Sequence, residues 1–386
     1  MLPSGPMSFA LEPEQVQLIE DTRRVAREHL VDVAEEGEPG RVNRQLVRAL
    51  AQRGLLGRLF PVSVGGTHRE NLSSTELCLL REALARECTE AETALALQGL
   101  GSYPILQSGP PEAVQRFIPP VARGEAVAAF ALTEPEHGSD AAHLEMRADA
   151  DGDGWRLTGE KTYISNAPDA DVYTVFARTT PDAGAKGVTA FVVLGSAEGI
   201  SGESIDLVAP HVVGTARFDG VRVGRDAVLG EVDAGFRVAM RTLDLFRPSV
   251  GAFAVGMAWA ALDAAVAHAG ERRSFGKRLR EHQAVSHLLA EMAARTEAAR
   301  LLVYSAAAAV DRGDPDVTKR SAMAKLVATE TAQWVVDGAV QIHGARGLER
   351  GHLLEKLYRE VRAPRIYEGT SEIQREVIAR ELYRDS

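Results

Sequence analysis

The class of fold is first indicated by VYTVFARTTPDAGAKGVTAFVVL, residues 172–194 of the chain. Runs of β-branched and aromatic residues at both ends of this stretch enclose a segment rich in turn-forming residues, which is typical of two strands joined by a loop. The same texture extends over residues 127–235, a zone that holds 14 of the 35 glycines. Further short runs at 155–157 and 216–223, the first preceded by the turn sequence DGDG (151–154), predict a small antiparallel barrel or sandwich.

The zones on either side of this segment show helical periodicity. An apolar run with helical spacing covers about residues 74–87. After residue 235, apolar residues recur every three or four positions over 281–312 and again over 318–342, with the breaker sequence DRGDP (311–315) between them. We therefore expect a helical domain at 1–126, a strand-rich domain at 127–235 and a second helical domain at 236–386.

Composition excludes several classes of protein. The chain has 386 residues, of which 45% are hydrophobic and 25% charged, as in ordinary globular proteins. Its 44 basic and 54 acidic residues give a formal charge of −10, whereas nucleic-acid binders show a basic surplus or stripe. No run approaches the roughly 20 uninterrupted apolar residues of a membrane span, and the N-terminus lacks the profile of a secretion signal. The two cysteines, Cys78 and Cys88, form no disulfide framework and favour a cytoplasmic location.

Common catalytic and binding motifs are missing. No G-x-G-x-x-G follows a predicted strand, so a nicotinamide site of the Rossmann type is not expected. The sequence GERRSFGK (270–277) only superficially resembles a phosphate loop, because Arg278 stands where a magnesium-binding Ser or Thr is required. Neither H-E-x-x-H nor G-x-S-x-G occurs, and the ten histidines are scattered. We expect no metal site.

Four other segments together carry a specific signal. They are FALTEPEHGSD (130–140), GEKTYISN (159–166), RRSFGK (272–277) followed by Gln283, and a C-terminal region that ends in IYEGTSEIQ (366–374). In this order and spacing they resemble the signatures of the acyl-CoA dehydrogenase family, flavin enzymes that desaturate acyl thioesters. The resemblance implies an α+β fold with an N-terminal helical domain, a central antiparallel β-barrel and a C-terminal domain of the four-helix-bundle type. It also implies FAD as the cofactor.

The chemistry of desaturation limits which groups can serve it. A weakly acidic α-proton and a β-hydride must leave the thioester. Because no side chain accepts a hydride well, a cofactor must accept it. A positioned group such as a carboxylate takes the proton. By resemblance, Glu368 is the base and its backbone N–H stabilises the enolate-like transition state, while the hydride passes to flavin N5. Burial is expected to raise the pKa of Glu368. The alternative to a catalytic role is that Glu368 is a solvated glutamate near a turn.

Substrate-side residues are also assigned by resemblance. Arg247, Tyr367 and Gly369 match positions that contact the substrate. A minority of the family places its base immediately before the arginine, but Phe246 occupies that position here and cannot take a proton. The alternative for Arg247 is a surface or salt-bridged arginine. The stretch ALQGLGSYP (96–104) matches the lining of the acyl pocket, and its small residues suggest either room for a bulky chain or simple helix packing.

For the flavin itself, the family pattern assigns Phe130, Leu132, Thr133, Ser139, Tyr163, Ser165 and Thr370. Tyr163 and Ser165 stand where the family usually has Trp and Thr, and both changes keep an aromatic face or a hydroxyl. The alternative for Tyr163 is a core aromatic residue of the barrel.

A second set of residues matches positions that reach the FAD of a neighbouring subunit, namely Arg272, Phe275, Gln341 and Gly344. The planar fork of Arg272 suits a pyrophosphate. Asp337 lies one helical turn before Gln341, and a helix cap or inter-helix contact is the alternative for this pair. Ala345 replaces the second glycine of the family's usual pair. A shared site requires assembly, and the resemblance implies a homotetramer built as a dimer of dimers.

The predicted activity is FAD-dependent conversion of a saturated acyl-CoA to the trans-2-enoyl thioester, with an electron-transfer flavoprotein as the electron acceptor. Three alternatives stay open. The same chemistry could act on an acyl group borne by a carrier protein, or oxygen could reoxidise the flavin as in an acyl-CoA oxidase. The chain could also be a flavin-binding interaction protein without catalysis, which the intact Glu368 disfavours.

Overall fold

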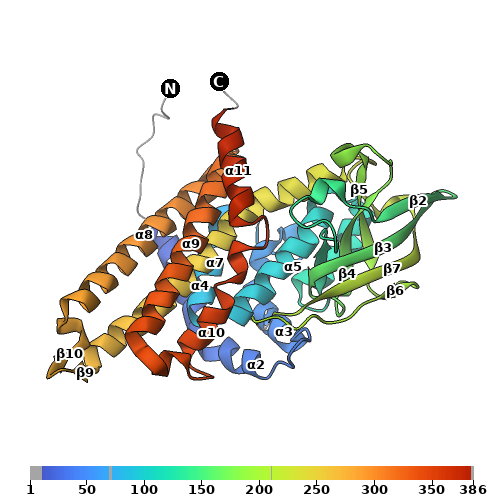
Figure 1. Cartoon of the computed structure of the whole chain (residues 1–386). Helices are drawn as coiled ribbons and strands as arrows, with labels where there is room; N and C mark the ends of the chain where they lie inside the picture. The colour runs from blue at the N-terminus through green and yellow to red at the C-terminus, as the bar shows by residue number, and fades with distance from the viewer. Residues whose placement is uncertain (1–10, 69–71, 210, 384–386) are drawn as a thin grey trace.

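The computed structural model describes residues 11–68, 72–209 and 211–383 of the chain. Figure 1 shows a sheet at one end of the molecule, a bundle of long helices at the other, and α5 between them. The predicted order of helical, strand-rich and helical segments is confirmed.

The N-terminal helices begin at well-defined caps. The Asn43 side chain accepts a hydrogen bond from Leu46 N, and the Ser73 hydroxyl accepts one from Glu76 N, which satisfies amide groups that a helix start leaves free. The helix predicted at 74–87 is present with these bounds. The helices of this part are α1 (Pro13–Val25), α2 (Val31–Glu35), α3 (Arg44–Gln52), α4 (Ser74–Glu87), α5 (Thr89–Ser108) and α6 (Pro111–Ala122).

The central part forms a mostly antiparallel sheet. Its strands are β1 (Ala128–Ala131), β2 (Arg147–Asp151), β3 (Gly154–Ser165), β4 (Val172–Arg178), β5 (Val188–Leu194), β6 (Ile200–Ser201), β7 (Val213–Val223) and β8 (Val228–Leu229). The order is β6-β7-β3-β2-β4-β5-β8, and β1 lies beside β4. Only the β1–β4 pairing and the single β2–β4 pair are parallel among the described strands. The stretch 172–194 forms the antiparallel pair β4–β5, as its pattern predicts.

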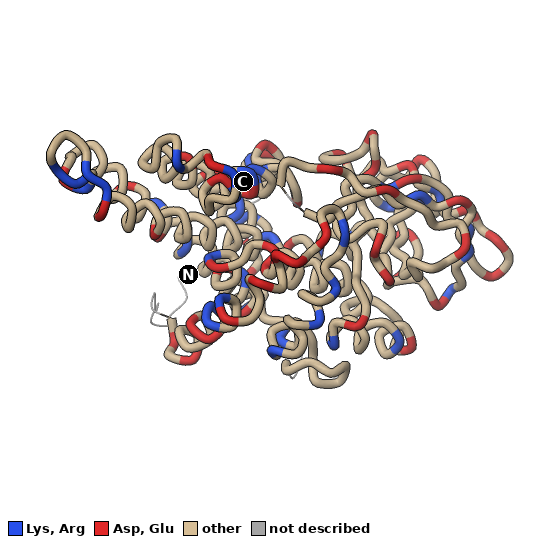
Figure 2. The backbone as a smooth tube through the Cα atoms, turned by 90° about the horizontal axis from the view of Figure 1, so that it is seen from below, with Lys and Arg blue, Asp and Glu red and all other residues tan. Residues whose placement is uncertain are grey.

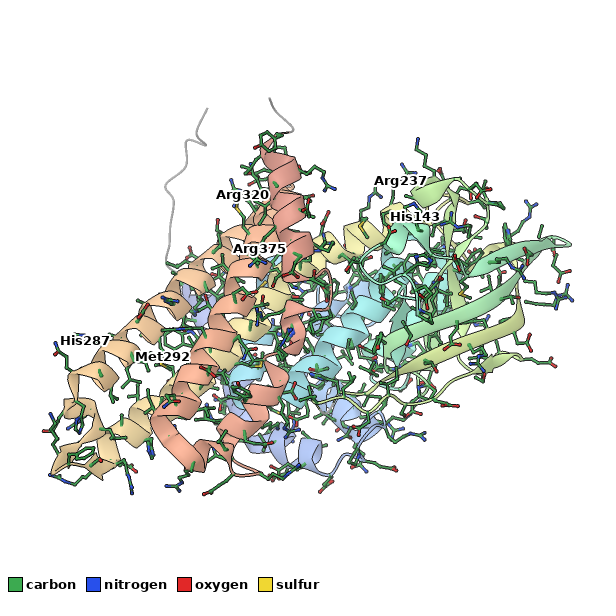
Figure 3. The ribbon with its side chains drawn as sticks, in the orientation of Figure 1. His143, Arg237, His287, Met292, Arg320 and Arg375 are labelled. Carbon is green, nitrogen blue, oxygen red and sulfur yellow. The ribbon has the colours of Figure 1, made fainter. Side chains whose placement is uncertain are left out.

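The C-terminal part consists of α7 (Gly235–Glu271), α8 (Gln283–Arg312), α9 (Val317–His343), α10 (Leu353–Glu360) and α11 (Ser371–Leu382). A short hairpin, β9 (Arg273–Ser274) and β10 (Lys277–Arg278), joins α7 to α8. Gly313 ends α8 in a left-handed conformation with φ 68°, which glycine adopts without steric cost. Figure 3 shows α9 and α11 side by side, with Arg320 and Arg375 labelled on them.

One described helix, α7, is long and apolar enough to cross a membrane by length and composition alone. Of its apolar window, 72% is buried within the protein, as expected for the core helix of a bundle. The packing of α7 therefore accounts for its apolar character.

One hydrophobic core joins all three parts of the chain. Leu95 of α5, Ala128 of β1, Phe176 of β4 and Phe246 of α7 belong to the same buried cluster. A second cluster fills the helical bundle, and a third lies within the sheet. Because α5 packs on both the sheet and α7, residues at this junction come from distant parts of the sequence.

Candidate active site

The turn before α11 presents the predicted base. Glu368 and Gly369 follow each other in the left-handed region, with φ values of 53° and 91°. That conformation is uncommon for a non-glycine residue and is typical of functional sites held by surrounding structure. A Cβ added to Gly369 would lie 2.6 Å from Nε2 of Gln374, so the position admits only glycine without a shift. The Thr370 hydroxyl caps α11 by accepting a hydrogen bond from Ile373 N at 3.3 Å.

Buried donors hold the backbone of this turn. Gln374 Nε2 donates to the carbonyl oxygens of Glu368 (3.1 Å) and Gly369 (2.9 Å). Lys325 Nζ also donates to Gly369 O at 2.7 Å, and Arg247 Nε approaches Glu368 O at 3.4 Å. Gln374 and Lys325 have no exposed surface. The two strained residues are therefore fixed from α7, α9 and α11 together.

The Glu368 residue is half-buried, and part of its carboxyl is withdrawn from solvent. Its Oε2 atom is buried and has no hydrogen-bond partner among the described residues. Burial raises the pKa of Glu368, while the charges of Arg81, Arg247 and Lys325 oppose that rise. Burial also raises the pKa of the adjacent Tyr367 well above its usual range, so its phenol stays protonated. A carboxylate in such surroundings is a stronger base toward a substrate than an exposed one.

Arg247 lies next to this turn. Its side chain is 8% exposed and its Nη1 atom lies 2.8 Å from Oδ1 of Asp244. The preceding Phe246 is fully buried and packs edge-on against Tyr103 at 6.0 Å between ring centroids. Arg247 is therefore salt-bridged to Asp244 and also in contact with the backbone of Glu368. A salt bridge and a position beside the predicted base thus occur together.

The two segments predicted to hold the flavin are fastened together. Thr162 N donates to Thr133 O at 3.0 Å, and Lys161 Nζ donates to Leu132 O at 3.0 Å. Lys161, with no exposed surface, also lies 2.7 Å from Oε1 of Glu134. Burial lowers the pKa of Lys161 to about 8. The Glu134–Lys161 pair was missed by the sequence analysis, although both residues lie in the quoted motifs.

Aromatic and hydroxyl groups at these segments are available to a ligand. The register of β3 against β7 shifts between Lys161 and Ile164, and Tyr163 within this bulge has φ 54° and is 62% exposed. Bulges re-aim side chains in this way, and Tyr163 is therefore not a core aromatic residue. The hydroxyls of Thr133, Ser139 and Ser165 have no hydrogen-bond partner in the described part of the chain. Unpaired short hydroxyls beside an exposed aromatic ring fit the polar edge and planar ring of a flavin.

The second predicted set lies elsewhere in the molecule. Phe275 lies in the turn of the β9–β10 hairpin at the far end of the bundle, and Arg272 joins α7 to this hairpin. Gln341 and Gly344 lie at the end of α9 nearby (Figure 1). Phe275 is 94% exposed. Figure 2 shows basic residues concentrated at this hairpin. The structure does not bring this set to Glu368 within one chain.

The expected acyl-pocket stretch packs tightly. A Cβ on Gly99 would lie 3.0 Å from the Phe246 ring, and one on Gly101 would lie 2.6 Å from Ala129 N. Both glycines are required for the close approach of α5 to α7 and β1. The small residues of this stretch therefore serve helix packing, one of the two interpretations of the sequence.

Arg81 of α4 and Glu92 of α5 form a buried ion pair near Tyr367 and Glu368. No sequence pattern indicated this pair.

Three family models match the chain in succession. The acyl-CoA dehydrogenase N-terminal domain matches residues 12–125, the middle domain residues 129–219 and the C-terminal domain residues 233–383. The chain belongs to the acyl-CoA dehydrogenase family. The order of the three family domains follows the helical, strand-rich and helical parts of the structure.

Family relatives resemble the chain over almost its full length. The probable acyl-CoA dehydrogenase FadE25 of Mycobacterium tuberculosis is 38% identical over 97% of both chains. The caffeyl-CoA reductase-Etf complex subunit CarC of Acetobacterium woodii is 37% identical, over 92% of this chain and 93% of that protein. Butyryl-CoA dehydrogenase of Megasphaera elsdenii has a solved structure with a TM-score of 0.92 and 33% identity, covering 98% of this chain and all of that one.

Proposed function

We propose that this chain is an FAD-dependent acyl-CoA dehydrogenase in which Glu368 removes the α-proton of a saturated acyl thioester to give the trans-2-enoyl product. Family membership supports the reaction class and the cofactor. The observation that carries the assignment of the base is the buried, unpartnered Oε2 atom of Glu368 on a left-handed residue. Buried polar atoms are normally hydrogen-bonded, so an orphaned carboxylate oxygen indicates a functional group that awaits its substrate.

When bound, FAD supplies the hydride acceptor that no amino-acid side chain provides. The chain's own residues bind, orient and deprotonate. Thr133, Ser139, Tyr163 and Ser165 would hold the flavin beside the sheet, with Phe130 and Leu132 behind them. Glu368 takes the proton at its carboxylate, and its backbone N–H would donate to the thioester oxygen as negative charge develops there. Arg247 and the donors to the Glu368–Gly369 carbonyls keep the base in a fixed geometry.

Substitution of the base tests this proposal directly. In Glu368→Gln the purified holoenzyme should retain its yellow colour, while flavin bleaching by a panel of acyl thioesters should slow by about 10²–10⁴-fold, the usual contribution of a positioned base. Glu376→Gln is the matched control, because this residue lies further along α11 and is exposed. Unimpaired bleaching in Glu368→Gln would exclude it as the base, and a purified chain that refuses FAD would favour a non-catalytic role.

The proposal also covers the carrier of the acyl group and the electron acceptor. An acyl-CoA is the first candidate because the relatives are named for CoA thioesters, and a thioester panel on coenzyme A and on a carrier protein separates the two. An electron-transfer flavoprotein is the proposed acceptor, supported by the similarity to a subunit of a complex with such a protein. Hydrogen peroxide release during turnover would instead identify an oxidase.

The proposal extends to the oligomeric state and the cellular location of the protein. We propose a homotetramer in which Arg272, Phe275, Gln341 and Gly344 serve the flavin of a neighbouring subunit. The exposed position of this set, remote from Glu368 in its own chain, supports that assignment. A cytoplasmic location stays a prediction, supported by the two buried free thiols of Cys78 and Cys88.

A further inference from the structure

Lys325 is an unusual feature of the bundle core. It has no exposed surface, although lysine is almost never fully buried unless it is paired. In the part of the chain that the structure describes, its ammonium makes one hydrogen bond, to Gly369 O at 2.7 Å, and no carboxylate lies within 4.0 Å. By contrast, the buried Lys161 has Oε1 of Glu134 at 2.7 Å. Lys325 therefore places a cation in the core without the direct partner that normally compensates its desolvation.

The hydrogen bond alone does not explain this lysine. Gln374 Nε2 already donates to Gly369 O at 2.9 Å and to Glu368 O at 3.1 Å. A neutral amide thus satisfies the same carbonyl without placing a charge in the core. What Lys325 adds to the turn is positive charge at the residue next to the base.

Charged groups on four helices surround this lysine and the base. Glu368 is the largest counter-charge to Lys325, with Glu330 of α9 and Glu372 of α11 contributing less, while Arg247 of α7 opposes it. Burial nevertheless lowers the pKa of Lys325 to about 8. Conversely, Lys325 acts with Arg81 of α4 and Arg247 to oppose the rise in the pKa of Glu368. Each of the two buried groups therefore favours the charged form of the other.

We propose that Lys325 is a positioning residue for the base: its buried ammonium holds the Gly369 carbonyl and keeps the adjacent Glu368 carboxyl ionised and ready to accept a proton. The inference rests on the proposed function, since it concerns Glu368 as the base. Arg81 and Arg247 also favour the ionised carboxyl, and Lys325 is the cation among these three that hydrogen-bonds the carbonyl of the next residue, Gly369. Without that charge a larger fraction of the protein would carry Glu368 protonated at neutral pH, and that fraction could not remove the α-proton.

The test compares Lys325→Met and Lys325→Gln with the unmodified holoenzyme. Lys325→Gln keeps a neutral donor and removes only the charge, so it separates electrostatics from structure. Infrared difference spectra over a pH titration report the Glu368 carboxyl directly, with Glu368→Gln identifying its band. We expect both variants to move the carboxyl midpoint upward by about one pH unit, the effect of losing a nearby opposite charge. The acid limb of the rate of flavin bleaching should move by the same amount.

Lys319→Met is the matched control, because Lys319 is a half-buried lysine of the same helix that forms no hydrogen bond or ion pair with the turn among the described residues. It should leave the carboxyl midpoint unchanged. A Lys325→Gln protein that is only less stable, with an unmoved midpoint and acid limb, would overturn the inference.

A second measurement covers the case in which the Lys325 variants do not fold. The sequence contains only six lysines, so ¹³C labelling of lysine allows Lys325 to be followed by NMR. In Glu368→Gln the Lys325 midpoint should fall below about 8, because its main counter-charge is gone. An unchanged midpoint of the Lys325 pH titration overturns only the inference about Lys325. Unimpaired flavin bleaching in the same variant overturns the proposed function.

Discussion

At the scale of single residues, the candidate site depends on a turn that tolerates no side chain at Gly369. This residue combines φ 91° with a close approach to Gln374, whereas Gly152 has a similar φ of 66° and open space around its Cβ position. Gly369→Ala should therefore displace the Gln374 amide and the base, and slow flavin bleaching by about 10²-fold, as expected for a misplaced catalytic group. Gly152→Ala should cost only about 1 kcal/mol of backbone strain and leave bleaching unchanged. Stopped-flow reduction and urea unfolding of both variants measure the two effects. Equal loss of activity in both would show that strain, and not the contact with Gln374, controls the turn.

At the scale of elements, the buried Glu134–Lys161 pair fastens the segment after β1 to strand β3. Glu134 also accepts hydrogen bonds from the backbone N–H groups of Glu145 and Met146, so its carboxylate joins three segments. Lys161→Met leaves that carboxylate without its counter-charge and should destabilise the protein by about 3–5 kcal/mol in urea unfolding, with weaker FAD binding. Lys186→Met, at an exposed position, is the control. The double variant Glu134→Gln/Lys161→Met should recover part of the loss. No recovery in this variant would mean that the packing of the lysine stem, and not its charge, provides the stability.

The same scale shows where sequence patterns suffice. Periodicity and turn residues predict β4, β5, α4, α8 and α9 well, because each pattern reflects burial along a single element. The left-handed turn at Glu368 and the burial of Lys325 could not be predicted in this way. A lysine in α9 resembles any solvated helix residue until α11 covers it. The roles of Glu134 and Lys161 likewise depend on the register between segments 27 residues apart, which periodicity does not specify.

At the scale of the whole molecule, the net charge of −10 conceals a strongly basic end. The hairpin region 272–280, RRSFGKRLR, carries five basic residues around the 94%-exposed Phe275. Figure 1 shows β9 and β10 at the end of the bundle away from α11, which directly follows the Glu368 turn. A large exposed aromatic ring with positive charge around it fits an interface that meets an anionic group of a neighbour. Phe275→Asp should therefore lower the oligomeric state in sedimentation velocity and weaken FAD binding together. Val62→Asp, a control at a 61%-exposed position in the N-terminal part, should change neither. If Phe275→Asp stays fully assembled with normal FAD affinity, the hairpin does not complete a neighbouring site, and each chain must hold its flavin alone.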